Sequence, residues 1–94
     1  MDLRDFQELM RRTYAERDAA RGPDATFRWL VEEVGEVARA MRRGDPENLR
    51  EEVGDALAWL TSLANLLGVD IADAAARYEH GCPKCGGMPC ACPL

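Results

Sequence analysis

The chain has 94 residues, of which 47% are hydrophobic, and its formal net charge at pH 7 is −5. This length allows one domain with a modest core, and the negative charge disfavours non-specific binding to nucleic-acid polymers. No run of about eighteen apolar residues occurs, so the sequence predicts neither a transmembrane helix nor a membrane partner. The first residues lack the pattern of a signal peptide, which favours a cytoplasmic location.

Hydrophobic spacing predicts two helices in the first half of the chain. The first covers residues 3–21, begins at an N-cap formed by Asp2 and ends at Gly22-Pro23. The second covers residues 25–43, with Asp24 as its expected cap. Its apolar side chains form a single stripe, which we expect to be its main buried face: Phe27, Leu30, Val31, Val34, Val37, Ala38 and Met41.

Three acids of the second helix lie away from that stripe. Placed at 100° per residue, Glu32, Glu33 and Glu36 fall within an arc of about 100°, centred about 150° from the apolar stripe. Trp29 lies in the same arc, one turn before Glu33. An indole among carboxylates indicates that another helix or a ligand covers this side of the helix too.

The segment Gly44-Asp45-Pro46 predicts the end of the second helix and the start of a third. The third helix is expected to run to about Leu67. It carries a second acidic pair, Glu52 and Asp55, at the edge of its apolar stripe, with Trp59 on the same side. Both helices of one hairpin therefore carry acids.

A short fourth helix is expected over about residues 71–80, with Asp70 as its N-cap. From Gly81 to Leu94 the periodicity ends, and Gly, Pro and Cys dominate the composition. The sequence therefore predicts an all-α domain over residues 1–80, followed by a Cys-rich tail over residues 81–94.

The acids suggest a site for a hard metal ion. Residues three and four apart are neighbours on a helix, so an antiparallel pair brings up to five of these carboxylates together. Close carboxylates repel each other unless a cation holds them. Because all the ligands are oxygens and no histidine is near, the pattern favours Mg²⁺ or Mn²⁺ over zinc. Such a site suits metal-assisted attack of water on a phosphate chain. The alternative is a solvated helix face on which the acids pair with arginines.

The acids are spaced as E-E-x-x-E, fifteen intervening residues and E-x-x-D, here Glu32-Glu33-x-x-Glu36 and Glu52-x-x-Asp55. With the flanking segments WLVEEVGEVARAM and LREEVGDALAWLTSLANLLGVDI, this pattern resembles the MazG-like all-α nucleoside triphosphate pyrophosphohydrolases over residues 24–78. The resemblance implies a four-helix protomer built on the acidic hairpin. It also implies hydrolysis of a nucleoside triphosphate to the monophosphate and pyrophosphate, a reaction that clears surplus or non-canonical nucleotides.

On this interpretation Mg²⁺ is held by four carboxylates: Glu33, Glu36, Glu52 and Asp55. Glu32 and Glu33 are the two candidates for orienting the attacking water. One rival hypothesis is a related hydrolase that acts on another pyrophosphate ester, such as a diphosphate or a phosphoribosyl nucleotide. The other is a zinc-stabilised helical interaction module without enzymatic activity.

Three further side chains are candidates for substrate contact. Trp29 and Trp59 offer flat apolar faces for a nucleobase, with packing in the core or in a dimer interface as the alternative. Arg43 is a candidate for phosphate contact, with an ordinary surface position as the alternative. Because two different sides of the second helix call for cover, we expect the protomer to form a homodimer or homotetramer.

The cysteines have the spacing C-x₂-C-x₄-C-x-C, at Cys82, Cys85, Cys90 and Cys92. Four thiolates so close in sequence favour one structural Zn²⁺ site, and disulfides are disfavoured in a cytosolic chain. The tight second pair departs from the usual two C-x-x-C halves. Free, redox-active or iron-binding thiols are the alternatives.

Overall fold

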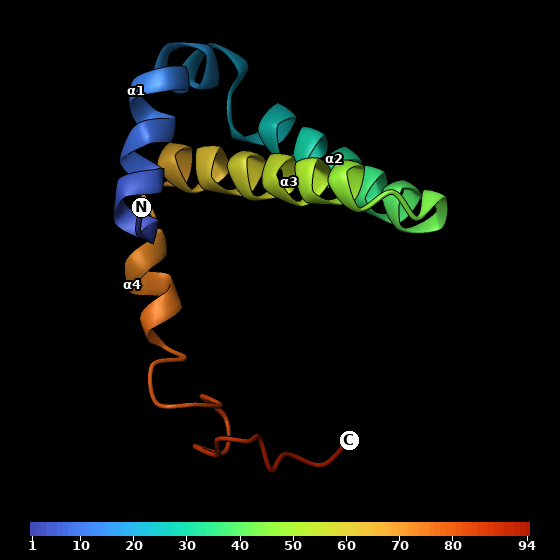
Figure 1. Ribbon diagram of the computed structural model, residues 1–94. Helices are drawn as coiled ribbons and strands as arrows, with labels where there is room; N and C mark the ends of the chain where they lie inside the picture. Colours follow the sequence, from blue (N-terminus) through green and yellow to red (C-terminus); the bar gives the residue numbers. More distant parts are fainter.

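The computed structural model describes residues 1–94 and contains four helices and no strand, which confirms the all-α prediction (Figure 1). The helices are α1 (Leu3–Arg21), α2 (Pro23–Arg43), α3 (Pro46–Leu67) and α4 (Ile71–Ala76). None of them combines the length and the apolar composition that crossing a bilayer requires.

Three helix starts follow the side-chain capping that the sequence predicts. Asp2 accepts a hydrogen bond from the backbone N–H of Asp5, whose side chain in turn accepts one from the backbone N–H of Asp2. Asp45 and Asp70 cap α3 and α4 in the same way, each accepting from two backbone N–H groups of the first turn. These caps fix where the chain leaves each connection and enters the next helix.

Two predicted helix ends are wrong. α2 begins at Pro23 with Gly22 as its N-cap, so Asp24 lies inside the first turn and does not cap the helix. Proline suits this first position because its missing N–H would be unpaired there and its φ is already helical. The fourth helix ends at Ala76 instead of residue 80, and Arg77 to His80 form tighter turns with bonds between residues three apart. This short helix packs mainly on α1, so little tertiary packing extends it.

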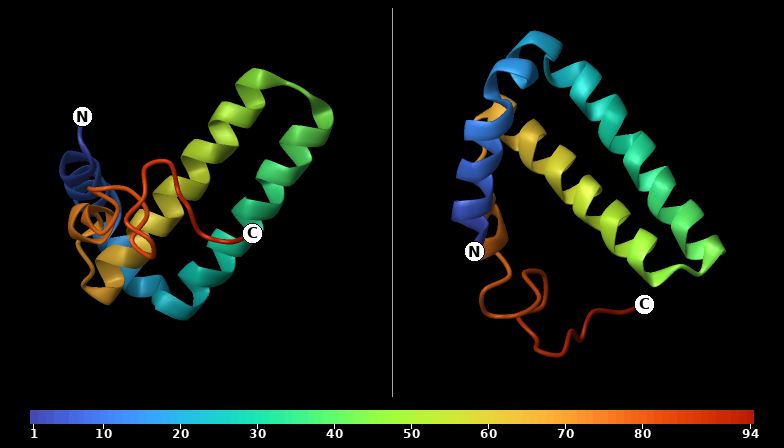
Figure 2. Two further views of the ribbon diagram at one scale, coloured as in Figure 1. Left: turned by 90° about the horizontal axis from the view of Figure 1, so that it is seen from below. Right: turned by 45° about the horizontal axis from the view of Figure 1, so that its top comes forward.

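α2 and α3 run side by side as a long antiparallel hairpin, and their connection lies far from the rest of the molecule (Figure 1). α1 lies across the open end of this hairpin, and α4 lies beside α1 near the N-terminus (Figure 2). The Cys-rich tail leaves α4 and stays apart from the hairpin in Figure 1. The protomer therefore consists of a projecting arm, the α2–α3 hairpin, and a small base formed by α1 and α4.

The joint between the base and the arm is polar. Gln7 of α1 donates a hydrogen bond to Asn65 Oδ1 at 2.9 Å and to the Val69 carbonyl at 2.8 Å. Its own Oε1 accepts from the backbone N–H of Ile71 at 2.9 Å. One buried glutamine therefore ties α1 to α3 and to the start of α4, which fixes the orientation of the base.

The predicted buried face of the second helix is corrected by the structure. The buried and half-buried side chains of α2 include a line at alternating steps of four and three residues: Thr26, Leu30, Glu33, Val37 and Ala40. Thr26 and Ala40 are almost fully buried, and such small side chains allow two helix backbones to approach closely. The packed side thus includes Glu33, although the acids were expected to lie away from the main buried face.

Much of the apolar stripe is instead exposed in the protomer. Besides Trp29, the large apolar side chains of α2 and α3 that are 42% to 66% exposed are Phe27, Val31, Val34, Met41, Val53, Leu57, Leu60 and Leu67. Phe27 of α2 lines one groove together with Leu63 and Leu67 of α3, so apolar residues of the two helices meet on one face. Only Met10, Ala40 and Ala64 form a buried hydrophobic core, which is little for a domain of this length.

Candidate functional site

Three carboxylates come together across the hairpin. Glu33 of α2 and Glu52 and Asp55 of α3 place carboxylate oxygens within 4.8 Å of one another. Glu33 reaches the group because it lies on the packed line of α2. Glu52 and Asp55 reach it because residues three apart share one face of a helix. These three residues are called the acid cluster below.

The acid cluster holds its negative charge without a cationic partner. The ion pairs of the protein involve Arg4, Arg11, Arg21 and Arg39, and none of them reaches the three carboxylates. Burial, followed by the charges of Asp55 and Glu52, raises the pKa of Glu33 above its ordinary value; Glu36 and Glu32 add smaller contributions. A divalent cation among these oxygens would remove the repulsion, so the donor set fits a hard metal ion.

The other two predicted acids lie beside the cluster, outside it. Glu36 is half-buried and forms an ion pair with Arg39, with 3.5 Å between Oε2 and Nη1. Glu32 is exposed. The structure thus brings together three of the four predicted metal ligands, and of the two candidates for orienting water only Glu33 lies in the group.

A cavity of about 260 Å³ opens beside the acid cluster. Asp55 and Trp59 of α3 form one wall, and α1 contributes the opposite wall with two arginines, Arg17 and Arg21. A carboxylate of the cluster and two guanidinium groups therefore face the same space. This arrangement suits a ligand that carries both phosphates and bound metal.

The two tryptophans stack on each other at the edge of this cavity. The ring centroids of Trp29 and Trp59 are 5.7 Å apart and the planes differ by 16°. The guanidinium carbon of Arg21 lies 4.6 Å from the centre of the Trp59 ring, a cation–π contact. Arg21 also donates to Thr26 Oγ1 at 2.9 Å and pairs with the buried Asp18. The stack is therefore held rigidly between α1, α2 and α3.

The contribution of α1 to this cavity was not predicted. Arg17 and Arg21 stand in a helix whose sequence signalled only an apolar spacing and an end at Gly22-Pro23. Their place beside Asp55 depends on how α1 crosses the hairpin, and no local pattern contains that angle. The predicted phosphate contact Arg43 is the last residue of α2, about 15 Å along the helix axis from Glu33. It does not line the cavity, and its role stays a prediction.

All four cysteines also come together. Their sulfur atoms lie within 4.8 Å of one another, and none is in a disulfide. Hydrogen bonds from the backbone N–H groups of Ala91 and Gly87 lower the pKa of Cys85 to about 6. Interaction with the side chains of Cys90, Cys82 and Cys85 raises the pKa of Cys92 to about 11. The predicted cysteine group is therefore present as one cluster, far in sequence from the acid cluster.

Comparison with known protein families identifies the family to which this hairpin belongs. The model of the MazG nucleotide pyrophosphohydrolase domain matches residues 21–85, which span α2, α3, α4 and the first two cysteines. The chain belongs to the MazG family. The uncharacterized protein YvdC of Bacillus subtilis (strain 168) is 30% identical over 101 aligned positions, which cover 89% of this chain and 95% of YvdC. The predicted resemblance is thereby confirmed.

Membership gives the acid cluster a chemical context. MazG domains hydrolyse nucleotides with release of pyrophosphate, and they typically use a divalent metal. In this MazG domain the oxygens of Glu33, Glu52 and Asp55 are the group whose geometry fits such an ion. The match also extends over α4 to Cys85, so the first cysteine pair lies inside the matched region and the second pair follows it.

The repulsion in the acid cluster leads to a prediction for the metal-free MazG domain. The pKa of Glu33 is raised in the folded protein, so the unfolded chain releases this proton at lower pH. The folded state is therefore destabilised relative to the unfolded state as the pH rises above about 4.5. We expect Glu33→Gln to raise the melting temperature in chelator by a few degrees at pH 7, and the gain to shrink towards pH 4. Thermal unfolding at one fixed protein concentration measures both effects.

Two comparisons make this result specific to the cluster. Glu51→Gln changes an exposed acid outside it, and we expect this variant to melt within about one degree of the unmodified protein. If Mg²⁺ binds the folded carboxylates, it should stabilise the unmodified protein more than Glu33→Gln. A Glu33→Gln variant that melts no higher than the unmodified protein in chelator at pH 7 contradicts the repulsion.

Proposed function

We propose that this MazG domain hydrolyses a nucleoside triphosphate to the nucleoside monophosphate and pyrophosphate, in the presence of Mg²⁺ or Mn²⁺. The observation that carries the proposal is the acid cluster at the edge of a cavity that also holds Arg17, Arg21 and Trp59. Carboxylates next to arginines and an indole match a metal-bound phosphate chain with a base attached.

The roles of the side chains follow from their charges. A bound divalent ion supplies charge neutralisation at the phosphate oxygens and polarises the anhydride. Glu52 and Asp55 would hold that ion from α3, and Glu36 would complete the ligand set from α2 if it gave up its ion pair with Arg39. Arg17 and Arg21 contact the phosphate oxygens that face α1.

Glu33 is the better candidate for orienting the water. Its carboxylate lies within the acid cluster, whereas Glu32 is exposed on the outer side of α2. From that position Glu33 would accept a proton from the water as its oxygen bonds to the α-phosphorus and the bond to the β-phosphate breaks, with pyrophosphate as the leaving group. Glu33 would also be a ligand of the ion.

The substrate assignment is tested with a panel of nucleotides. Release of monophosphate and pyrophosphate is measured for nucleoside triphosphates, nucleoside diphosphates and phosphoribosyl nucleotides, each with and without Mg²⁺. We expect metal-dependent turnover of at least one triphosphate. Turnover of another pyrophosphate ester alone supports the rival hydrolase, and no turnover by folded protein supports a role as an interaction module.

The cavity wall from α1 yields a prediction about binding. Arg17 is exposed, lines the cavity and forms no ion pair within the protein, so its removal leaves no buried partner behind. We expect Arg17→Ala to raise KM for the preferred triphosphate about tenfold, with a smaller change in kcat. Steady-state kinetics measures both parameters.

The matched control is Arg12→Ala, which removes the same charge from an exposed position of α1 outside the cavity. We expect its KM to stay within about twofold of the unmodified protein, because exposed charges at a distance are screened. Equal effects of the two variants would show that only the overall charge matters and would refute the phosphate contact of Arg17.

We also propose that the protomers associate as a homodimer or homotetramer. The support is the exposed apolar face of α2 and α3 together with the small buried core of a single protomer. A second copy of this face would cover it, since hydrophobic residues left in water favour association.

A further inference from the structure

The sulfur atoms of the tail stand at the spacing of a metal–thiolate tetrahedron. Cys82 Sγ lies 3.7 Å from Cys92 Sγ, and Cys85 Sγ lies 3.9 Å from Cys90 Sγ. Four sulfurs bound at about 2.3 Å to one Zn²⁺ are separated by about 3.8 Å along each tetrahedral edge. Both measured pairs match that edge, and all four sulfurs fall within 4.8 Å of one another.

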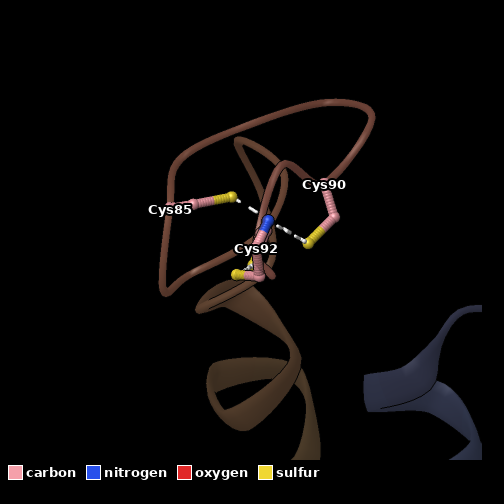
Figure 3. Close-up of side chains that lie close together, drawn as sticks. Cys85, Cys90 and Cys92 are labelled. Carbon is pink, nitrogen blue, oxygen red and sulfur yellow. Dashed lines mark hydrogen bonds between the residues drawn. The ribbon is translucent and has the colours of Figure 1, made fainter. Parts of the chain in front are cut away.

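The backbone is folded around these sulfurs. Cys85 Sγ accepts hydrogen bonds from the N–H groups of Gly87 at 3.4 Å and Ala91 at 3.3 Å. Cys90 Sγ accepts one from the N–H of Cys92 at 3.4 Å (Figure 3). Such donors stabilise negative sulfur, the form that binds metal. Two of the sulfurs thus have the backbone N–H donors that typically surround metal-bound thiolates.

Glycines allow the loop to close this tightly. The N–H of Cys82 donates to the Gly87 carbonyl at 2.9 Å, and the N–H of Gly86 donates back to the Cys82 carbonyl at 2.7 Å. A Cβ added at Gly81 would lie 2.7 Å from the Gly87 carbonyl oxygen, and a Cβ added at Gly87 would lie 2.7 Å from that of Pro89. Larger residues at these two positions would therefore collide with the backbone that positions the cysteines.

Hydrophobic packing does not explain this fold. No residue from 81 to 94 is buried, and the side chain of Met88 in this segment is 76% exposed. Figure 1 shows the segment hanging from α4, apart from the hairpin. A segment without a core needs another source of stability, which in small motifs is a metal or a disulfide. The cysteines here are unpaired.

We propose that Cys82, Cys85, Cys90 and Cys92 bind one Zn²⁺ in a closed, structural site that folds residues 81–94. Four thiolates fill a tetrahedral shell, so no coordination position is left for water or substrate. Thiolates prefer this softer ion to Mg²⁺, and the Irving–Williams order places Zn²⁺ above Fe²⁺ in affinity. The site is separate from the acid cluster, whose ligands are all oxygens.

The first test uses the 94-residue chain purified under reducing conditions without chelator. Elemental analysis should find about one zinc per chain. After removal of that zinc, titration with Co²⁺ should give the intense visible bands of tetrahedral cobalt and a thiolate charge-transfer band, and Zn²⁺ should abolish both. Cobalt bound at the acid cluster is oxygen-ligated and absorbs only weakly, so the two sites are distinguished by spectrum.

Matched variants assign the signal to the cysteines. The double variant Cys82→Ser/Cys85→Ser should lose the zinc and the intense cobalt spectrum, while Lys84→Ser, between the same two cysteines, should keep both. Circular dichroism should show that the four helices remain in the double variant. Its pyrophosphate release, measured with Mg²⁺, should stay within about twofold of the unmodified protein.

Four outcomes would overturn the proposal. One is the reduced 94-residue chain that contains no zinc and gives no intense cobalt spectrum. Another is iron at one per chain that Zn²⁺ does not displace, or cysteines found as disulfides in protein kept under reductant throughout. The last is loss of turnover by the double variant with intact helices. This result would refute a purely structural site even if the unmodified protein binds zinc.

Discussion

Replacing Asp55 with asparagine, or Glu52 with glutamine, is expected to lower the rate of pyrophosphate release at least about a hundredfold. Both residues sit in the acid cluster, and Asp55 also borders the cavity. Each change removes one negative ligand while it preserves the shape of the side chain. A hundredfold loss corresponds to about 2.7 kcal/mol of transition-state stabilisation, a common contribution of one charged group at a metal-assisted reaction. Single-turnover and steady-state assays at saturating Mg²⁺ measure the loss.

The control for α3 is Glu51→Gln, which removes a carboxylate adjacent in sequence to Glu52 and exposed to solvent. We expect it to keep at least about half of the activity. A chelator should abolish turnover by the unmodified protein, and Mg²⁺ or Mn²⁺ should restore it. Normal turnover of folded Asp55→Asn or Glu52→Gln would remove the acid cluster from the reaction.

Glu36 tests whether a fourth carboxylate joins the ion. Its pairing with Arg39 lies at the surface, with the Arg39 side chain 52% and the Glu36 side chain 32% exposed. Surface pairs contribute only about 0–1 kcal/mol, so a divalent ion would readily draw the Glu36 side chain away. We therefore expect Glu36→Gln to reduce turnover about as strongly as Asp55→Asn, and Arg39→Ala to leave it largely unchanged. The opposite ranking would mean that the ion pair, and not the metal, accounts for Glu36.

The helices themselves could be predicted from local chemistry. Gly22-Pro23 and Gly44-Asp45-Pro46 place backbone restrictions and caps at the helix ends, and these signals act within a few residues. The acid cluster could also be predicted from the sequence, because the three-residue spacing of Glu52 and Asp55 and the antiparallel hairpin together bring the carboxylates close. Where the local capping signal was weaker, the prediction was wrong: α2 starts before Asp24, and α4 stops at Ala76.

The faces of the helices could not be predicted in the same way. An apolar stripe indicates that a surface is to be covered, but it does not identify the partner that covers it. In α2 the buried side includes Thr26, Ala40 and Glu33, and the larger apolar residues Val34 and Met41 are left exposed. The arginines of the cavity were missed for a related reason, since the angle at which α1 crosses the hairpin depends on a distant polar joint.

Disrupting the exposed apolar face is expected to produce monomers. Val34 lies on α2 and is 57% exposed in the protomer. If a second copy covers this face, Val34→Arg buries an unpaired charge at the contact and association fails. Light scattering or sedimentation at micromolar concentration should give at least 20.8 kDa for the unmodified protein, twice the 10.4 kDa of one chain, and 10.4 kDa for the variant.

The matched control is Ala15→Arg, which adds the same charge at an exposed position of α1 and should leave the mass unchanged. Full burial of one valine, leucine or phenylalanine side chain contributes about 1.5–3 kcal/mol, and association costs about 4–15 kcal/mol. Because the eight side chains are already about half buried, covering them on both protomers of a dimer contributes roughly 12–24 kcal/mol, which is comparable to or larger than that cost. The melting temperature of the unmodified protein should therefore rise with concentration, and that of Val34→Arg should not. A mass of 10.4 kDa for the unmodified protein at micromolar concentration would leave the apolar face without a second copy and refute the assembly.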